Sequence, residues 1–534
     1  MGTYYNPGKH GFERALNSKI YVDKTGLIEY TNSVLDSEQA YICVSRPRRF
    51  GKSMTAEMLV AYYDKTCDSS ELFNGLKITE SPDYKKHLNQ YDIIHIDVAA
   101  LLQVTDKETG EKITAGKTVK YLQQVVIAEL RQKFPTIVND DEVDLPTVLG
   151  TIHLHTGMMF IVIIDEWDAI FREDKMDTKA QQAYISLLRG MFKSAASKKF
   201  IKLAYMTGIL PIKKYGTESA LNNFDEFTMT GADILAEYVG FTEKEVHELY
   251  EEYHMNFIEA KRWYDGYHLV ENLHIYNPKS VVDSIRRKKI TSYWTTSGSY
   301  ETLKNYIVMN FDGLKDAVIQ MLTGGSCKIN PDKFQNDMVS FHSKDDILVL
   351  LIHLGYLAYD IDHKIVYIPN EEIRREYINA IEETDWDYVI RAIADSDALL
   401  RSTWQKDERA VAKAIDTVHE ANTSIVKYND ENLLSCVIAL AYYNAINEYT
   451  IIRELPSGKG YADIVFLPRK KSDKPAMVVE LKWDKSVEGA IEQIKDKQYT
   501  QALQDYHGNL LLVGINYNKK TKKHQCRIES IERN

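Results

Sequence analysis

Residues 41–60 constrain the fold more than any other part of the sequence. They begin with a short apolar run, pass through a tight basic loop and reach Gly51-Lys52-Ser53 before an amphipathic segment. We expect a strand, a loop and a helix in that order. The backbone N–H groups of such a loop and the positive end of the new helix face an anion, and a lysine adds a point charge. The pattern predicts a phosphate-binding loop in which the Ser53 hydroxyl is a ligand for Mg²⁺.

The loop departs from the general motif G-x-x-x-x-G-K-S/T at its first glycine. Arg46 stands at that position, and Pro47 fixes φ and removes one N–H donor. A basic turn that caps an ordinary helix is therefore the alternative. The residues predicted to contact a nucleotide around the loop are Arg48, Arg49, Phe50, Gly51, Lys52, Ser53 and Met54.

A second informative stretch ends in two carboxylates. Six apolar residues, 159–164, run directly into Asp165 and Glu166. A strand buried on both faces is typical of a parallel sheet, and ligands collect at the carboxyl ends of such strands. Asp165 can hold Mg²⁺ through its water shell, and Glu166 can orient or deprotonate the attacking water in nucleotide hydrolysis. The alternative is a strand end that leads into a helix N-cap, where Asp and Glu are also favoured.

Further strands and helices complete an α/β pattern in this half of the chain. Residues 91–98 and 200–208 read as strands, and residues 118–134 and 178–196 read as helices. Thr207, at the polar end of its strand, is predicted to sense the γ-phosphate of a bound nucleotide. The alternative for Thr207 is a strand-terminating Thr-Gly turn.

The C-terminal part carries a separate constellation of charged residues. Asp463 lies near the beginning of a predicted strand, and Glu480 and Lys482 lie two residues apart on the next one, so the latter two project from one face. If the strands are antiparallel neighbours, two carboxylates and an ammonium converge. The carboxylates can bind Mg²⁺, and Lys482 can position water or offset charge. The alternative is a cross-strand salt bridge on a solvated face.

Composition limits the number of domains, the kinds of binding partner and the cellular compartment that the chain can have. A chain of 534 residues is expected to form two to four domains, and its 44% hydrophobic and 27% charged residues are those of a soluble globular protein. The net charge of -11 requires any nucleic acid to meet a local basic groove. Five scattered Cys without a C-x-x-C pair favour a reducing cytosol, and neither a signal peptide nor a membrane-spanning run is recognisable. We therefore expect a cytoplasmic protein without a membrane partner.

The order of several motifs resembles a bacterial family of AAA-ATPase-like P-loop proteins joined to a PD-(D/E)xK nuclease domain. The segments that carry this resemblance are residues 21–25 (YVDKT), 46–53 (RPRRFGKS), 164–168 (IDEWD), 263–267 (WYDGY), 276–282 (YNPKSVV) and 293–298 (YWTTSG). The family itself carries the RPRRFGKS form of the loop, so Arg46 does not count against a phosphate site. The resemblance implies ATP binding more firmly than turnover. It places residues 263–267 beyond the nucleotide core, where their aromatic side chains are expected to pack rather than to act in catalysis.

Residues 425–534 resemble the nuclease part of that family, with Gly460-Tyr-Ala-Asp463 in place of the Pro-Asp pair. The resemblance implies a catalytic centre of Asp463, Glu480 and Lys482 that uses Mg²⁺ or Mn²⁺. It also implies that Gln493, on a helix, lies beside this centre and that Glu431 provides an extra carboxylate for the metal.

The sequence thus predicts an α/β multidomain protein with three regions. These are an AAA-like P-loop ATPase core over 1–240, a helical and winged-helix-like middle over 241–425, and a restriction-endonuclease-like domain over 426–534. The predicted function is ATP hydrolysis coupled to metal-dependent cleavage of DNA or RNA, in defence or in the processing of mobile elements. One alternative is a nucleotide-controlled regulatory or scaffold protein that binds nucleic acid or partners without cutting. Another is an ATPase that acts on protein. A monomer, a dimer and a larger homo-oligomer all remain open.

Overall fold

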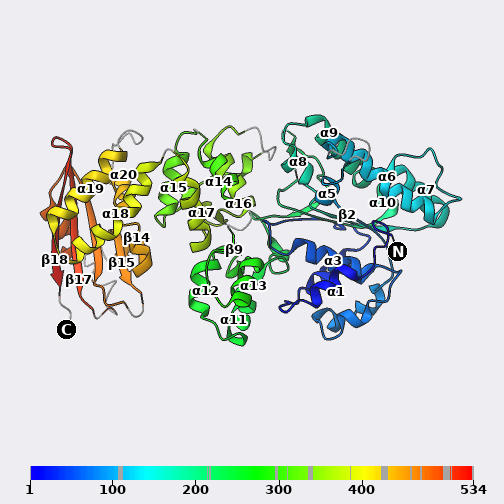
Figure 1. The fold of residues 1–534 in the computed structure, drawn as a ribbon, viewed down its shortest axis with the longest axis horizontal. Helices are drawn as coiled ribbons and strands as arrows, with labels where there is room; N and C mark the ends of the chain where they lie inside the picture. The colour runs from blue at the N-terminus through cyan, green and yellow to red at the C-terminus, as the bar shows by residue number, and fades with distance from the viewer. Residues whose placement is uncertain are drawn as a thin grey trace. The chain divides into compact units, whose positions relative to one another are not determined.

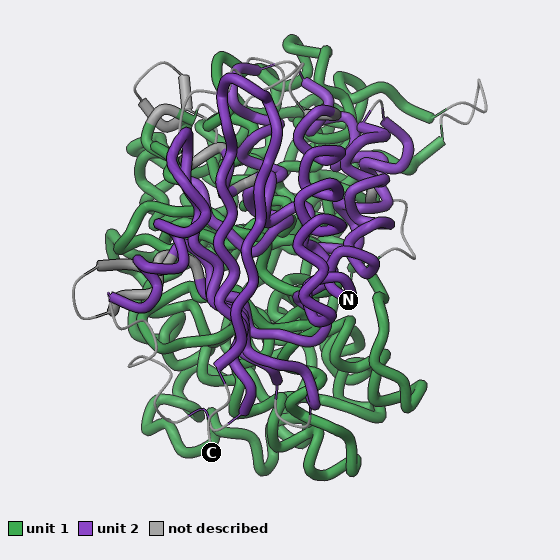
Figure 2. The backbone as a smooth tube through the Cα atoms, turned by 90° about the vertical axis from the view of Figure 1, so that its left-hand side faces the viewer, with its two compact units in different colours: residues 1–296, 328–373 green, residues 297–327, 374–534 purple. Residues whose placement is uncertain are grey.

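The computed structural model describes most of the chain. It covers residues 2–105, 112–212, 214–215, 218–294, 299–309, 311–334, 341–384, 386–422, 431–457, 460–469, 472–496, 506 and 508–531. These residues form two compact units (Figure 2), unit 1 with residues 1–296 and 328–373 and unit 2 with residues 297–327 and 374–534. The domain boundaries expected near 240 and 425 stay predictions. Within the described ranges, no helix combines the length and the apolar character needed to cross a membrane.

The main sheet of unit 1 is parallel throughout, as predicted. Its order is β2-β3-β4-β1-β7, and each pair of neighbours runs in the same direction. Because β4 lies between β1 and β3, the basic loop after β1 and the carboxylates after β3 emerge at the same edge of the sheet. The strands are β1 (Tyr41–Ser45), β2 (Asp92–Asp97), β3 (Phe160–Asp165), β4 (Ile201–Gly208) and β7 (Asp225–Phe227).

Helices cover both faces of this sheet (Figure 1). One face carries α3, with α1 packed on it, and the other carries α6, α7 and α9, whose apolar residues share a core with the strands. The helices of this part are α1 (His10–Leu16), α2 (Gly26–Val34), α3 (Lys52–Tyr63), α4 (Tyr84–His87), α5 (Val98–Leu101), α6 (Ala115–Lys133), α7 (Leu145–Thr156), α8 (Ala169–Glu173), α9 (Thr178–Phe192) and α10 (Ser197–Phe200).

The rest of unit 1, as far as the structure describes it, contains three small sheets and several helices, and one of these sheets is the antiparallel pair β5-β6. Another has the order β8-β10-β9, and the third, β11-β13-β12, contains a hairpin of β12 and β13 that follows an apolar helix. That helix, α16, ends at Leu354 because Gly355 adopts a left-handed conformation. The elements are β5 (Lys214–Tyr215), β6 (Glu218–Ser219), β8 (Phe241–Thr242), α11 (Glu243–Glu252), α12 (Phe257–Tyr264), β9 (Tyr267–Val270), β10 (Leu273–Tyr276), α13 (Pro278–Arg287), α16 (Lys344–Leu354), β12 (Ala358–Asp360) and β13 (Ile365–Tyr367).

Unit 2 is built on a mixed five-stranded sheet with the order β14-β15-β16-β17-β18. Only β16 and β17 are parallel, and α22 connects them and packs on both. The elements are α14 (Ser299–Ile307), α15 (Leu314–Leu322), α18 (Asp387–Trp404), α19 (Glu408–Asn422), α20 (Glu431–Ala441), α21 (Ala445–Glu448), β14 (Tyr449–Ser457), β15 (Gly460–Pro468), β16 (Ala476–Trp483), α22 (Val487–Asp496), β17 (Leu510–Asn518) and β18 (Lys523–Ile531). Two further elements cross the boundary between the units, β11 (Cys327–Lys328) and α17 (Glu371–Glu382).

Candidate functional site

The basic loop connects β1 directly to α3. Gly51 precedes the helix with a φ of 90°, and a Cβ added there would meet nothing within 4 Å, so conformation rather than crowding favours glycine. Lys52 begins the helix, and its Nζ donates to the carbonyl of Pro47 at 3.0 Å. Ser53 and Met54 are exposed on the first turn. The loop therefore closes on itself through Lys52 and presents the helix N-terminus outward.

Arg46 has a structural position beneath this loop. Its side chain is fully buried, and it donates to the carbonyls of Ser45 at 2.9 Å and Phe227 at 3.0 Å. Burial lowers the pKa of Arg46 to about 10. The residue that replaces the first glycine of the general motif thus ties β1 to β7.

The acidic residues after β3 meet the lysine of the loop. Glu166 Oε1 lies 3.5 Å from Lys52 Nζ, and Glu166 Oε2 accepts a hydrogen bond from Arg172 on α8. Burial raises the pKa of Glu166, but the charges of Lys52 and Arg172 outweigh this and leave the pKa lowered. Glu166 therefore stays ionised between two cations. Arg172 also donates to Asp168 at 2.9 Å.

Asp165 and Thr207 lie together at the ends of β3 and β4. Thr207 Oγ1 donates to Asp165 Oδ1, which also accepts the backbone N–H of Glu166 at 3.0 Å. Asp165 is 4% exposed and Thr207 is fully buried. Both residues support the carboxylate cluster, and neither lines the neighbouring cavity.

A cavity of about 900 Å³ opens beside this cluster within unit 1. All seven loop residues predicted to contact a nucleotide, 48–54, line it together with Glu166 and Arg172. Other walls come from segments far apart in the sequence, including Ile20, Tyr21, Val22, Tyr238, Phe241, Lys279 and Arg286. The lining therefore combines cationic side chains with apolar and aromatic ones, which suits a ligand that has both a polyphosphate and a base.

Arg49 links the loop to a buried carboxyl group. Its guanidinium donates to the carbonyls of Tyr293 at 3.0 Å and Trp294 at 3.3 Å. The N–H groups of the same two residues donate to Glu372 Oε1 at 2.6 and 3.1 Å, and Ser280 donates to Glu372 Oε2 at 2.7 Å. Burial raises the pKa of Glu372 to about 7.

The second group of predicted residues lies on one face of the unit 2 sheet. β15 and β16 are antiparallel, with Ile464 opposite Val479, so Asp463 and Glu480 are neighbours across the pair. Asp463 Oδ2 accepts the backbone N–H of Leu481 at 2.6 Å. Because side chains alternate along a strand, Glu480 and Lys482 share the face that α22 covers.

These side chains form a compact network around Glu480. Lys482 Nζ lies 2.8 Å from Glu480 Oε1, and Gln493 on α22 donates to the same oxygen. The side chain of Glu480 is 2% exposed and that of Lys482 is 10% exposed. The structure thus brings Asp463, Glu480, Lys482 and Gln493 together. Glu431 begins α20, but its side chain lies outside the described side chains.

Comparisons with known families agree with both parts of this description. Residues 10–217 match the family model of a predicted AAA-ATPase, and residues 429–526 match that of the PD-(D/E)XK nuclease superfamily. Each match covers one part of the chain. The resemblance expected from the sequence is confirmed, and the parallel core and the C-terminal α/β sheet fit it. No curated protein matches the chain significantly.

Three solved structures show distant similarity to the chain. The ORC2 protein of Aeropyrum pernix, in ADPNP and ADP complexes, is 10% identical with a TM-score of 0.30, covering 69% of this chain and 98% of its own. DnaA bound to AMPPCP and single-stranded DNA is 11% identical with a TM-score of 0.24, covering 76% and 97%. The ORC1 protein of A. pernix in complex with DNA is 11% identical with a TM-score of 0.25, covering 72% and 98%. These proteins are too distant to support an inference about this chain.

Sequence reasoning missed several residues that the fold brings to the first site. Arg172 and Asp168 are four residues apart on one helical turn, and that spacing could have suggested an ion pair. The cavity residues Tyr21 and Lys279 belong to the segments 21–25 and 276–282, for which the sequence predicts a place in the motif order but no role for either residue. Glu372 had no signal in the sequence, because its partners Tyr293 and Trp294 lie about 80 residues away.

Proposed function

We propose that this protein binds and hydrolyses ATP in the unit 1 cavity and cleaves phosphodiester bonds of nucleic acid at the unit 2 cluster. The observation that carries the proposal is the convergence of Asp463, Glu480 and Lys482 on one sheet face, in a chain that also has the loop and acidic pair of a nucleotide site. The two family matches support the same pairing of activities.

At the first site, Lys52 would exchange its present partners, the Pro47 carbonyl and Glu166, for the phosphates of ATP. Glu166, kept ionised by its cationic neighbours, would then accept a proton from the attacking water or orient it. Ser53 and Asp165 would hold Mg²⁺, which neutralises phosphate charge when bound. Thr207 would sense the γ-phosphate through Asp165, to which it donates.

At the second site, the donor set suits a hard divalent cation, because Asp463 and Glu480 offer carboxylate oxygens on adjacent strands. Mg²⁺ or Mn²⁺ held there would supply Lewis acidity toward a phosphodiester. Lys482 would position water or offset the charge that develops on the phosphate. Gln493 would orient the Glu480 carboxylate, to which it already donates.

One observation favours a second candidate function. Glu480 is almost fully buried, and its Oε1 already accepts from Lys482 and Gln493. A nucleotide-controlled regulatory protein that binds nucleic acid or a partner without cutting would keep such a closed network for stability. The two candidates differ in whether any phosphodiester bond is broken.

The test compares the parent with Asp463→Asn on labelled single- and double-stranded DNA and RNA. Each substrate is incubated with Mg²⁺ or Mn²⁺, with and without ATP. Asp463→Asn removes a charge while keeping an oxygen for the Leu481 N–H, so the fold is preserved. We expect cleavage by the parent and none by the variant. Asp473→Asn is the matched control, since its 86% exposed carboxylate contacts Lys474 near the same sheet.

Cleavage that Asp463→Asn leaves unchanged, or an inactive parent on all four substrates, would favour the non-cutting candidate. The substrate panel also decides between DNA and RNA. We place the activity in the cytoplasm, which is consistent with five Cys scattered along the sequence without a C-x-x-C pair. A role in defence or in the processing of mobile elements, and assembly into a homo-oligomer, complete the proposal.

A further inference from the structure

The 263–267 segment combines buried aromatic residues with one carboxylate. Trp263, Tyr264 and Tyr267 are between 1% and 7% exposed and pack as the sequence predicted. Asp265 lies between them at the end of α12 and is 8% exposed. A carboxylate in such a position needs cationic or hydrogen-bonding partners. Its partners come from the hairpin of β9 and β10.

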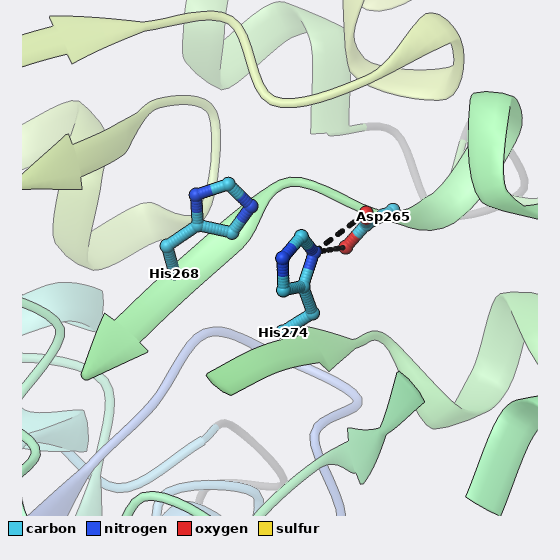
Figure 3. A group of neighbouring side chains, drawn as sticks. All are labelled: Asp265, His268 and His274. Atoms are coloured by element: carbon cyan, nitrogen blue, oxygen red, sulfur yellow. Dashed lines mark hydrogen bonds and ion pairs between the residues drawn. The ribbon is translucent and has the colours of Figure 1, made fainter. Parts of the chain in front are cut away.

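Two histidines face each other across this hairpin beside Asp265. His268 on β9 and His274 on β10 are opposite in register, and their ring centroids are 4.1 Å apart. Nδ1 of His274 lies 2.8 and 3.1 Å from the two carboxylate oxygens of Asp265. Figure 3 shows the His274 ring between the His268 ring and the carboxylate. One oxygen of Asp265 and one nitrogen of each ring lie within 4.8 Å of one another.

Tyr367 on β13 selects the tautomer of His268. The Tyr367 hydroxyl donates its single proton to the carbonyl of Gly266 at 3.1 Å, so toward His268 Nδ1, at 3.3 Å, it can only accept. Neutral His268 must then carry its proton on Nδ1 and leave the Nε2 lone pair available. An outer partner that fixes the tautomer is a regular feature of histidine metal ligands.

The charges around the group favour a cation. Glu243 Oε2 lies 3.5 Å from His274 Nδ1 and accepts from Lys261 at 2.6 Å and from Tyr276 at 3.3 Å. Lys261 Nζ is also 4.0 Å from Asp265. The two carboxylates of this group, Glu243 and Asp265, and the ammonium of Lys261 together carry a net charge of -1. A divalent ion reverses this charge rather than adding to an existing positive one.

We propose that Asp265, His268 and His274 form a binding site for a transition-metal ion of the zinc class. Two imidazoles and one carboxylate suit Zn²⁺ or Co²⁺, whereas Mg²⁺ prefers oxygen ligands. Ligands of one zinc ion lie roughly 3–4 Å apart, so closing the group requires side-chain movements of about 1 Å. Among the residues that the structure describes, this is the group of three ligating side chains that meets such a distance limit.

The competing interpretation is a plain ion pair between His274 and Asp265, with His268 merely adjacent. The two interpretations differ in what His268 contributes. An ion pair needs no lone pair from His268 and does not change when the Tyr367 hydroxyl is removed. A metal site depends on the His268 lone pair and on the Tyr367 hydroxyl that fixes its tautomer. The bound ion would hold the end of α12, the β9–β10 hairpin and, through Tyr367, β13 in one arrangement.

The experiment titrates the metal-stripped full chain with Zn²⁺ by calorimetry and with Co²⁺ by visible absorption. We expect one Zn²⁺ site that an excess of Mg²⁺ does not occupy. His268→Ala and His274→Ala should each lower its affinity by more than about 100-fold, because even losing an outer partner costs about 10- to 100-fold. Tyr367→Phe should lower the affinity by about 10-fold. Zn²⁺ should also raise the melting temperature of the parent, since it binds the folded chain.

His363→Ala is the matched control. His363 forms a pair with Asp360 at 2.9 Å, like the pair of His274 with Asp265, but on an exposed turn. The His363→Ala variant should bind Zn²⁺ with the same affinity as the parent. His268 is exposed, so its replacement tests the site without endangering the fold. Equal Zn²⁺ affinity in the parent and His268→Ala, displacement of Zn²⁺ by Mg²⁺, or no binding by the parent would each overturn the proposal. None of these results would bear on ATP binding or on nucleic acid cleavage.

Discussion

The two proposed sites hold a lysine and a glutamate in different ways. In unit 1, Lys52 and Glu166 are 3.5 Å apart beside an open cavity, and the Glu166 side chain is 21% exposed. In unit 2, Lys482 and Glu480 are 2.8 Å apart, and the Glu480 side chain is 2% exposed. The first pair is longer and its carboxylate is partly exposed, whereas the second pair is shorter and its carboxylate is buried.

This difference indicates how each site would take a ligand. An incoming phosphate at the first site has to replace the bond of Lys52 to the Pro47 carbonyl and its longer contact with Glu166, in a cavity that already exists. A cation at the second site has to compete with Lys482 and Gln493 for the same oxygen of Glu480. Removing one partner of a buried ion pair is costly unless another charge replaces it. We therefore expect the first site to be preformed and the second to depend on its cation.

The largest expected effect is on ATP hydrolysis. Glu166→Gln removes the base while keeping a similar shape, so hydrolysis should fall by about 100-fold or more. ATP binding should persist and become somewhat tighter, because Lys52 loses a competing carboxylate. Steady-state phosphate release and equilibrium binding measure the two quantities. Glu173→Gln, whose 52% exposed carboxylate also lines the cavity, is the control. Weakened binding together with unchanged hydrolysis would refute the role given to Glu166.

A smaller effect is expected from Lys482→Gln, which tests the closed character of the second site. Gln keeps a donor toward Glu480 but removes the competing charge. Mn²⁺ should therefore bind more tightly, while cleavage falls by about 10-fold because charge stabilisation is lost. Electron paramagnetic resonance reports bound Mn²⁺, and gel assays report cleavage. If Mn²⁺ affinity falls instead, Lys482 supports the cation site rather than competing with it.

The smallest effect concerns stability and pH at the carboxyl group that holds Tyr293 and Trp294. The pKa of Glu372 is raised by burial from 4.5 to about 7, so the folded state retains a proton that the unfolded state has lost. The stability this provides is complete below about pH 4.5 and disappears as the pH rises through 7. The difference amounts to about 3 kcal/mol at most.

Glu372→Gln should remove this dependence. Between pH 5 and 8 the melting temperature of the parent should fall more steeply than that of the variant, as thermal unfolding at each pH will measure. Glu371→Gln, one position earlier in the same helix and near Arg262, is the control and should keep the slope of the parent. Equal slopes for the parent and Glu372→Gln would contradict the account.

The sequence predicted those parts of the sites that short spacings encode. Glu480 and Lys482 share a face because a strand has a period of two, and the loop around Gly51 needs only neighbouring residues. The carboxylates after β3 followed from one buried apolar run. The structure places these residues where the local patterns predict them, because each pattern depends on a single element.

Contacts between distant elements were not predictable in this way. The pairing of Asp265 with His268 and His274 depends on the register of the β9–β10 hairpin, which no local pattern specifies. Phe50, predicted as a nucleotide contact, is also a packing residue, because its ring meets Tyr267 edge to face at 5.5 Å. Contacts of this kind become visible only in the three-dimensional structure, because they join residues of different elements.

The most direct test of the central claim measures both sites in the same two variants. Nucleotide affinity and Mn²⁺-dependent cleavage are determined for Lys52→Ala and Asp463→Asn beside the parent. The account predicts that Lys52→Ala loses nucleotide binding yet still binds Mn²⁺ at the second site, and that Asp463→Asn loses cleavage with nucleotide affinity unchanged. If Lys52→Ala binds ATP as the parent does, or Asp463→Asn still cleaves, the account of two distinct sites is wrong.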